Sequence, residues 1–415
     1  MTQRRLIVCF DGTWNEPDKG ENPTNVVKLV RAIKCKAGDV SQITFYDKGV
    51  GTGGPLDRIA GGASGEGLTR NMIDGYRFIA NNYEDGDEIY AFGFSRGAYT
   101  ARSLVGFIGL AGIISPLALG SELRKAIEIY RHEELNRKHK LERMNALDRE
   151  FVFGRKTGVP IRCIGVWDTV GALGIPGDLG RRLVSKNYFH DVQLSDKVEV
   201  ALHAIAIDEK RGAFAPTLWV RKKGDSPPPG QTVEQVWFCG VHSNVGGSYV
   251  DAGLSDLALD WLIKRVHELT GLEFDQQYMA DHVRPDAYGK GVESRTALYL
   301  GSKLYPYQRL IGQTVPEAGG FGGWFRKTFS VLDRRYEPPD GSETINEMLH
   351  VAALERWAKP VVWDCPEDEE GKPRDYRPVN LAAVIRAHHG GRLMPVVDHD
   401  GHIMTPQAAP WPAAP

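Results

Sequence analysis

Short apolar runs alternate with longer stretches of helical spacing up to about residue 270 of the chain. This alternation is typical of a mostly parallel β-sheet covered by helices. The sequence therefore predicts an α/β fold with that architecture. We expect buried strands at 6–10, 43–46, 88–92, 160–167 and 233–239, and helices at 26–33, 67–82, 96–109 and 254–269.

One segment of this pattern fits either a strand or a helix. Its apolar residues Val198, Leu202 and Ile205 share one helical face, and a serine and an aspartate just before them offer an N-cap. We therefore expect a helix at 198–207.

The pattern changes in two further places. A charged stretch at 122–149 keeps helical periodicity and predicts an exposed helical insertion. After about residue 275 the regular pattern breaks down, apart from one expected helix at 344–357. These changes predict a catalytic core at 1–275, with the helical insertion at about 115–150. We expect residues 276–400 to form a C-terminal cap packed on this core, and residues 401–415 to form a flexible tail.

Composition narrows the class of protein. The 51 basic and 53 acidic residues give a formal net charge of -2, so the chain has no sign of a nucleic-acid partner. Cys9, Cys163 and Cys239 lie in apolar runs and read as small buried residues of a reduced protein. No spacing resembles a zinc site, and the glycine-rich stretch 49–54 lacks the Lys-Ser/Thr pair of a phosphate loop. We expect no metal and no cofactor.

Apolar stretches of the sequence bear on the cellular location of the protein. The apolar stretch near the N-terminus is too short for a signal peptide and meets Asp11 at once. No run approaches the roughly 20 apolar residues that a membrane span requires. We expect a cytoplasmic protein by default, and secretion without a cleavable signal stays open.

A short turn carries the first candidate chemistry. Gly93-Phe94-Ser95-Arg96-Gly97 follows an expected strand and opens an expected helix rich in small residues. This is the setting of a nucleophile elbow, in which strained backbone projects a serine hydroxyl above the sheet. The backbone N–H of Arg96 is then placed to bind an oxyanion. The alternative interpretation is a tight turn capped by a serine.

A nucleophilic serine needs a base and an orienting carboxylate, which this kind of fold places after later strands in the order acid, then histidine. Asp168 ends one expected strand, 73 positions after Ser95. His242 follows the next long expected strand, 74 positions after Asp168. A turn aspartate and an ordinary core histidine are the structural alternatives. Ser95, Asp168 and His242 are therefore the predicted triad of a serine hydrolase of the α/β-hydrolase type.

Other residues are held in reserve. His350 is the reserve base, and Asp208 and Asp11 are the reserve acids. Gly12 or Thr13, just after the first strand, is expected to give the second oxyanion N–H. The alternative there is an Asx turn that leaves the strand.

Six motifs occur in order along the chain, and together they resemble the uncharacterised α/β-hydrolase domain family linked to type VI secretion lipase effectors. The likeness covers about residues 4–270, and DYRPVNL (375–381) resembles the family's C-terminal part. It implies a Ser-Asp-His triad at the three positions above and ester hydrolysis, with phospholipid deacylation as the best-known activity. The motifs are FDGTWN (10–15), YDKGVGT (46–52), GFSRGAYTAR (93–102), GVWDTVGALG (165–174), AIDEKRGAFAPTLW (206–219) and GVHSNVGGSY (240–249).

The expected partner is a small-molecule or lipid ester. Phe321, Trp324 and Phe325, with two basic residues beside them, are a candidate patch for transient contact with a membrane surface. Packing of these aromatics under the cap is the alternative. Three other functions stay open: a small-molecule or polyester esterase, a lipid- or partner-binding module of the same fold with little catalysis, and a metal-dependent phosphoesterase that uses Asp11 and Asp208.

Overall fold

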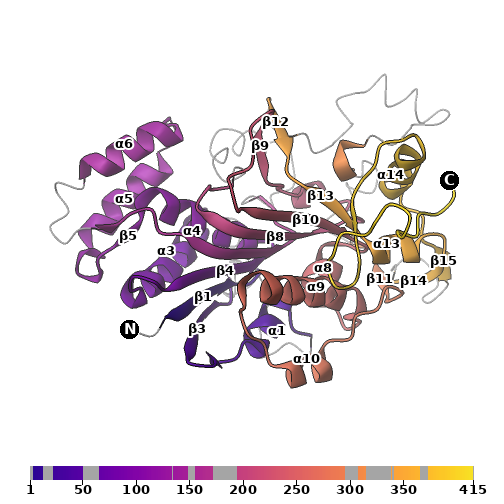
Figure 1. Cartoon of the computed structure of the whole chain (residues 1–415), viewed down its shortest axis with the longest axis horizontal. Helices are drawn as coiled ribbons and strands as arrows, with labels where there is room; N and C mark the ends of the chain where they lie inside the picture. The colour runs from indigo at the N-terminus through magenta and orange to yellow at the C-terminus, as the bar shows by residue number, and fades with distance from the viewer. Residues whose placement is uncertain are drawn as a thin grey trace, which may run out of the picture.

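The computed structural model describes residues 3–12, 22–49, 65–132, 134–147, 155–171, 194–294, 307–314, 338, 341–364 and 373–414. These residues form a nine-stranded sheet in the order β16-β13-β10-β8-β7-β4-β1-β3-β2 (Figure 1). Every neighbouring pair of these strands is parallel except β2 and β3. The strands are β1 (Arg4–Phe10), β2 (Lys36–Ala37), β3 (Val40–Asp47), β4 (Glu88–Phe94), β7 (Ile161–Trp167), β8 (Val198–Ala206), β10 (Thr232–Phe238), β13 (Glu347–His350) and β16 (Val396–Val397).

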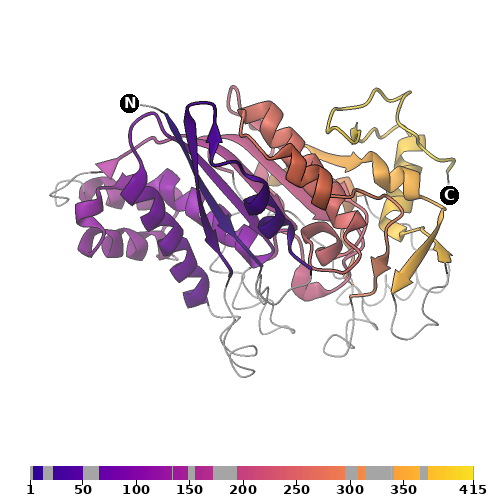
Figure 2. The ribbon, with the colours of Figure 1, turned by 90° about the horizontal axis from the view of Figure 1, so that it is seen from below.

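Helices cover both faces of this sheet, as Figure 2 shows from the side of α1 and α9. The side chains of β1 divide between the two layers: Ile7 and Cys9 pack into the core under α1 and α9, and Leu6, Val8 and Phe10 pack into the core under α3 and α4. The predicted mostly parallel sheet flanked by helices is therefore confirmed. The four helices are α1 (Asn25–Ala32), α3 (Gly65–Asn82), α4 (Arg96–Ala111) and α9 (Gly253–Thr270).

The helical insertion follows α4. It consists of α5 (Ser121–Arg131) and α6 (Arg137–Leu147), which lie at one end of the molecule in Figure 1. The paired short strands β5 (Ile113–Ile114) and β6 (Arg155–Lys156) bracket it. Leu123, Ala126 and Met144 are buried in the same core as α4, so the insertion packs on the sheet layer.

By the C-terminal part of the chain we mean the described residues after 275. Its strands and helices from β13 onward lie at the other end of the molecule (Figure 1). It adds β13 and β16 to the central sheet, so it is joined to the core by strand pairing as well as by packing. The stretch expected as a flexible tail makes specific contacts: the N–H of Met404 donates to the Val396 carbonyl at 2.8 Å, and the Trp411 ring stacks on His388 at 4.0 Å.

Shorter elements complete the described chain, and none of its helices is long and apolar enough to cross a membrane. They are η1 (Pro116–Ala118), η2 (Gly212–Phe214), α8 (His242–Gly246), α10 (Gln276–His282), η4 (Ile311–Gln313), α13 (Val351–Arg356), α14 (Val379–His389), β9 (Val220–Lys222) paired with β12 (Ser342–Thr344), and a small sheet of β11 (Gly291–Val292), β14 (Pro360–Asp364) and β15 (Pro373–Asp375).

Two expected helices are wrong. The segment at 198–207 is the strand β8, which pairs with β7 and β10 and is buried at every position except Glu199. A strand buried on both faces has no polar side, so its apolar positions also satisfied a helical template. The segment at 344–357 contains β13 and only the short helix α13.

Candidate active site

Ser95 stands between β4 and α4 in a backbone conformation that is rare for a residue with a side chain, at φ 60° and ψ -122°. A Cβ at Gly93 would lie 2.5 Å from the Gly97 carbonyl oxygen, and one at Gly97 would overlap the carbonyl oxygen of Phe10. Both positions therefore require glycine. The Ser95 hydroxyl makes no capping hydrogen bond to α4, unlike the serine of the simple capped turn.

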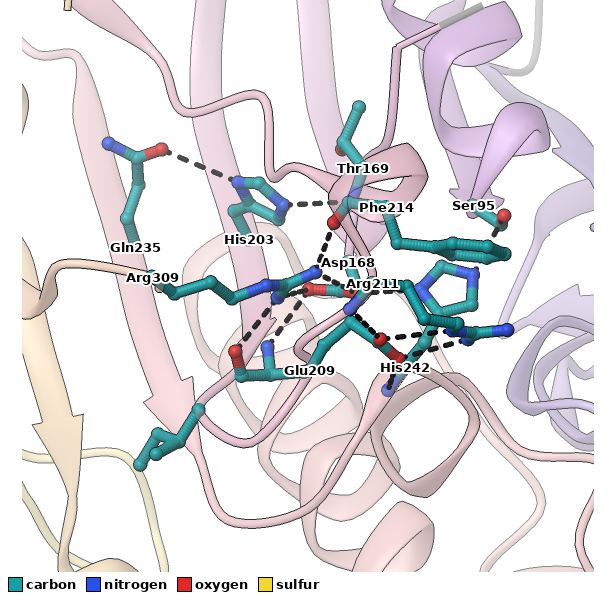
Figure 3. A network of polar contacts seen from close by, with 12 residues as sticks. Ser95, Asp168, Thr169, His203, Glu209, Arg211, Phe214, Gln235, His242 and Arg309 are labelled. Carbon is teal, nitrogen blue, oxygen red and sulfur yellow. Dashed lines mark hydrogen bonds and ion pairs between the residues drawn. The ribbon is translucent and has the colours of Figure 1, made fainter. Parts of the chain in front are cut away.

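The hydroxyl of Ser95 instead meets His242, as Figure 3 shows. His242 follows β10 as the first residue of α8, and its Nε2 lies 2.8 Å from Ser95 Oγ. Its Nδ1 lies 2.6 Å from Oδ2 of Asp168, the residue just after β7. The carboxyl ends of three parallel strands thus bring together the three residues that the sequence predicted as a triad.

The Asp168 carboxylate is fully buried and held from several directions. Its Oδ1 accepts the N–H of Ala206 at 2.9 Å, and both of its oxygens bind the guanidinium of Arg309. The next N–H, that of Thr169, donates at 3.2 Å to Nε2 of His203, a histidine whose pKa burial lowers to about 3. Burial raises the pKa of Asp168, but Arg309 and His242 outweigh burial and hold it well below its usual range. Asp168 is therefore an anion fixed in place.

The ionised state of Asp168 sets the tautomer of His242. A carboxylate can only accept, so Nδ1 of the imidazole must donate to it, and Nε2 of the neutral ring is left to accept the Ser95 proton. Burial lowers the pKa of His242, and the hydrogen bond that its ring donates to the charged Asp168 offsets this only in part. The neutral base is thus the favoured form near pH 7.

Two aromatic rings and a second carboxylate surround His242. Phe94 lies 4.6 Å and Phe214 4.8 Å from the imidazole, centroid to centroid. Oε2 of the buried Glu209 accepts the backbone N–H of His242 at 3.3 Å and pairs with Arg211 at 2.9 Å. Burial raises the pKa of Glu209, but Arg211 outweighs it, so this carboxyl is also an anion.

The loop after β1 touches the Ser95 turn, since Gly97 packs on the Phe10 and Asp11 carbonyls. Arg96 is the first residue of α4, where backbone N–H groups point out of the helix end. The Gly12 N–H donates to Oδ1 of Asp11 at 2.7 Å. Thr13 lies outside the described residues.

The reserve residues are engaged elsewhere. Asp11 also accepts the hydroxyls of Thr24 and Tyr46, at 2.8 and 2.9 Å. Asp208 accepts the N–H of Gly240 at 2.6 Å and the Tyr376 hydroxyl at 2.9 Å. The third, His350, is the N-cap of α13, and its ring stacks on Phe238 at 4.6 Å. In the part of the chain that the structure describes, no cluster of His, Cys, Asp or Glu could hold a metal.

Sequence reasoning missed four residues of this site. Glu209, Arg211 and Phe214 belong to the motif AIDEKRGAFAPTLW, so the motif itself was the signal that could have found them. Arg309 belongs to no motif and lies 141 positions from its partner Asp168. The candidate membrane patch at Phe321, Trp324 and Phe325 lies outside the described residues.

Comparison with known proteins identifies a family. The model of the family described as "T6SS, Phospholipase effector Tle1-like, catalytic domain" matches residues 4–265. That range contains Ser95, Asp168 and His242 and ends before Arg309.

Individual relatives match only in part. The chain is 32% identical over 230 residues to the uncharacterized protein YEL023C of Saccharomyces cerevisiae, a match that covers 51% of this chain and 32% of the yeast protein. Among solved structures, an uncharacterized protein from Pseudomonas aeruginosa has a TM-score of 0.42 at 16% identity, over 69% of this chain and 49% of that one. A Tle1 effector bound to the VgrG spike of the type 6 secretion system has a TM-score of 0.34 at 20% identity, over 61% and 52%. An esterase from Thermogutta terrifontis has a TM-score of 0.32 at 12% identity, over 65% and 84%.

Proposed function

The chain belongs to the Tle1-like phospholipase effector family of type VI secretion, and on this premise we propose that it is a serine hydrolase that cleaves carboxylic esters, lipid acyl esters among them. The observation that carries the proposal is a continuous pair of short hydrogen bonds. Asp168 contacts His242 at 2.6 Å and His242 contacts Ser95 at 2.8 Å. Nucleophile, base and orienting acid are thereby assigned to these three residues.

The reaction is acyl transfer in two steps. His242 Nε2 takes the proton of Ser95 while Oγ attacks the ester carbonyl carbon, and the same imidazole then gives that proton to the departing alkoxide. Water attacks the acyl-serine with His242 again as base, and the carboxylic acid leaves as Ser95 recovers its proton. Asp168 keeps the imidazole in the required tautomer and stabilises the imidazolium.

The tetrahedral intermediate carries a negative oxygen that needs fixed donors. We assign the first donor to the N–H of Arg96 at the start of α4. The second comes from the loop at Gly12 and Thr13. Because the Gly12 N–H donates to Asp11, Thr13 is the stronger assignment of the two.

Turnover by a Ser95→Ala variant tests the reaction. Removal of the nucleophile is expected to lower kcat for p-nitrophenyl butyrate by about 10⁶-fold. The far-UV circular dichroism spectrum should stay that of the wild type. Turnover within tenfold of the wild type would refute the triad.

The family supports a lipid ester as the proposed substrate class, and this part of the proposal is tested separately. Release of fatty acid from phosphatidylglycerol or phosphatidylcholine vesicles by the wild type, and not by Ser95→Ala, is the expected result. Hydrolysis of short soluble esters alone would favour a small-molecule or polyester esterase. Vesicle binding without any turnover would favour a lipid-binding module of the same fold.

Contact with a lipid surface is assigned to the sequence patch Phe321, Trp324 and Phe325. Aromatic side chains beside basic residues suit the boundary between lipid headgroups and acyl chains. Co-sedimentation with anionic vesicles should be weaker for Trp324→Ser than for the wild type. Equal binding by the two forms would remove this patch from the account.

A further inference from the structure

Arg309 comes from the C-terminal part of the chain, outside the matched catalytic domain, yet its side chain lies against the candidate triad. The guanidinium is fully buried and grips both oxygens of one carboxylate. Its Nη1 lies 2.6 Å from Oδ1 of Asp168, and its Nη2 lies 3.0 Å from Oδ2. In Figure 3, Arg309 and His242 flank Asp168 from opposite sides.

Further hydrogen bonds fix the orientation of this guanidinium. Nη1 donates to the carbonyl of Ala206, the last residue of β8, at 2.8 Å, and Nη2 donates to the Phe214 carbonyl at 2.6 Å. The backbone is held as well, since the side-chain amide of Asn380 on α14 donates to the Arg309 carbonyl at 3.2 Å and to that of Ile207 at 2.9 Å. The planar fork of Arg309 is therefore preorganised for a carboxylate.

The described charged groups around His242 form two ion pairs with no net charge. Arg309 pairs with Asp168, and Arg211 pairs with Glu209. An Asp168 carboxylate without Arg309 would be a buried, uncompensated anion beside the imidazole, and it would favour the imidazolium more strongly. The base would then be protonated at higher pH.

We propose that Arg309 is a positioning residue of the active site: its guanidinium fixes both oxygens of Asp168 and moderates the pull of that carboxylate on His242. The inference rests on the triad proposed above. It implies that the hydrolytic centre is completed by a residue of the C-terminal part, beyond residues 4–265 that the family model matches.

The experiment measures the pH dependence of kcat/KM for p-nitrophenyl butyrate, whose acid limb reports protonation of the base in the free enzyme. In the wild type this limb should lie below the ordinary histidine value of about 6.5, since the pKa of His242 is lowered chiefly by burial. Arg309→Gln should move the limb up by about one pH unit. KM should stay within twofold, because the buried Arg309 does not reach the substrate.

Arg309→Lys separates charge from geometry. One ammonium retains the positive charge but cannot bind both oxygens in the plane of the carboxylate, so the acid limb should stay at the wild-type pH while kcat falls about tenfold. This variant keeps the inference falsifiable if Arg309→Gln fails to fold. Wild-type kcat in Arg309→Lys would overturn the positioning role.

Arg356→Gln is the matched control. Arg356 is also a fully buried arginine, but it bonds the carbonyls of Ala287 and Gly289 at 2.7 and 2.9 Å. The control is expected to lose stability without moving the acid limb. An equal shift of the acid limb in Arg356→Gln, or an unmoved acid limb in Arg309→Gln, would overturn the inference. The proposed function would still stand in that case if a fluorophosphonate labels Ser95 of the wild type. Absence of wild-type labelling and turnover would overturn both.

Discussion

The strand-end loops and the C-terminal part of the chain approach the Asp168 carboxylate from opposite sides, and they contribute to it in different ways (Figure 3). The strand ends supply the proposed reactive groups, Ser95 and His242, on short turns. The C-terminal part supplies Arg309, which touches no reacting atom. One region carries the proposed chemistry, and the other holds it in place.

The backbone is strained at two residues of the strand ends. Ser95 and Asp168 both have positive φ, 60° and 38°, and such strain persists only where the surroundings over-determine it. Their surroundings include the Gly97 contact with β1 and the Arg309 pair. The comparison suggests that damage to the strand ends should abolish turnover, whereas damage to the C-terminal part should tune it.

The largest expected effect is that of Asp168→Asn at the strand ends. The amide would donate where a carboxylate accepts, and His242 would adopt the wrong tautomer, so kcat for p-nitrophenyl butyrate should fall by about 10⁴-fold. Asp208→Asn is the control, since that buried carboxyl bonds Gly240 and Tyr376. An equal loss in the control would move the acid from Asp168 to Asp208.

A smaller effect is expected from Gly97→Ala, which tests the close approach of the Ser95 turn to β1. The new methyl group would overlap the Phe10 carbonyl, and either the turn or the strand must shift. We expect a loss of about 3 kcal/mol in the free energy of urea unfolding. Gly120→Ala, at a glycine with open space around its Cβ position, is the control. Wild-type stability of Gly97→Ala would contradict the packing of this turn.

The smallest effect should come from Tyr376→Phe in the C-terminal part. It removes the hydroxyl that bonds Asp208 but keeps the ring, and should lower the unfolding free energy by about 1 kcal/mol with kcat almost unchanged. Tyr288→Phe, at an exposed tyrosine, should change neither quantity. A large loss of kcat in Tyr376→Phe would erase the distinction between the two regions.

The sequence predicted the site better at the strand ends for a physical reason. Each of Ser95, Asp168 and His242 follows a buried apolar run, and parallel strands end at the same edge of the sheet. Order along the chain therefore translated into proximity. The assignment of catalytic roles to these residues stays a prediction.

The other features of the fold and site could not be predicted from local sequence patterns. Arg309 belongs to no recognised motif, and its partner Asp168 lies 141 positions away, so no periodicity or turn signal marks it. The strand β8 was mistaken for a helix because burial on both faces removes the alternation that distinguishes a strand. Contacts between residues far apart in the sequence determine both the Arg309–Asp168 ion pair and the pairing of β8 with β7 and β10.

Treatment of the wild type with a fluorophosphonate, followed by peptide mass spectrometry, tests the central claim most directly, because only an activated serine reacts readily with this reagent. The account predicts one phosphonyl adduct, on the peptide that contains Ser95, with esterase activity lost in proportion to labelling. The His242→Gln variant should label far more slowly. An active enzyme that is not labelled, or an adduct on another serine that accompanies inactivation, would contradict the account.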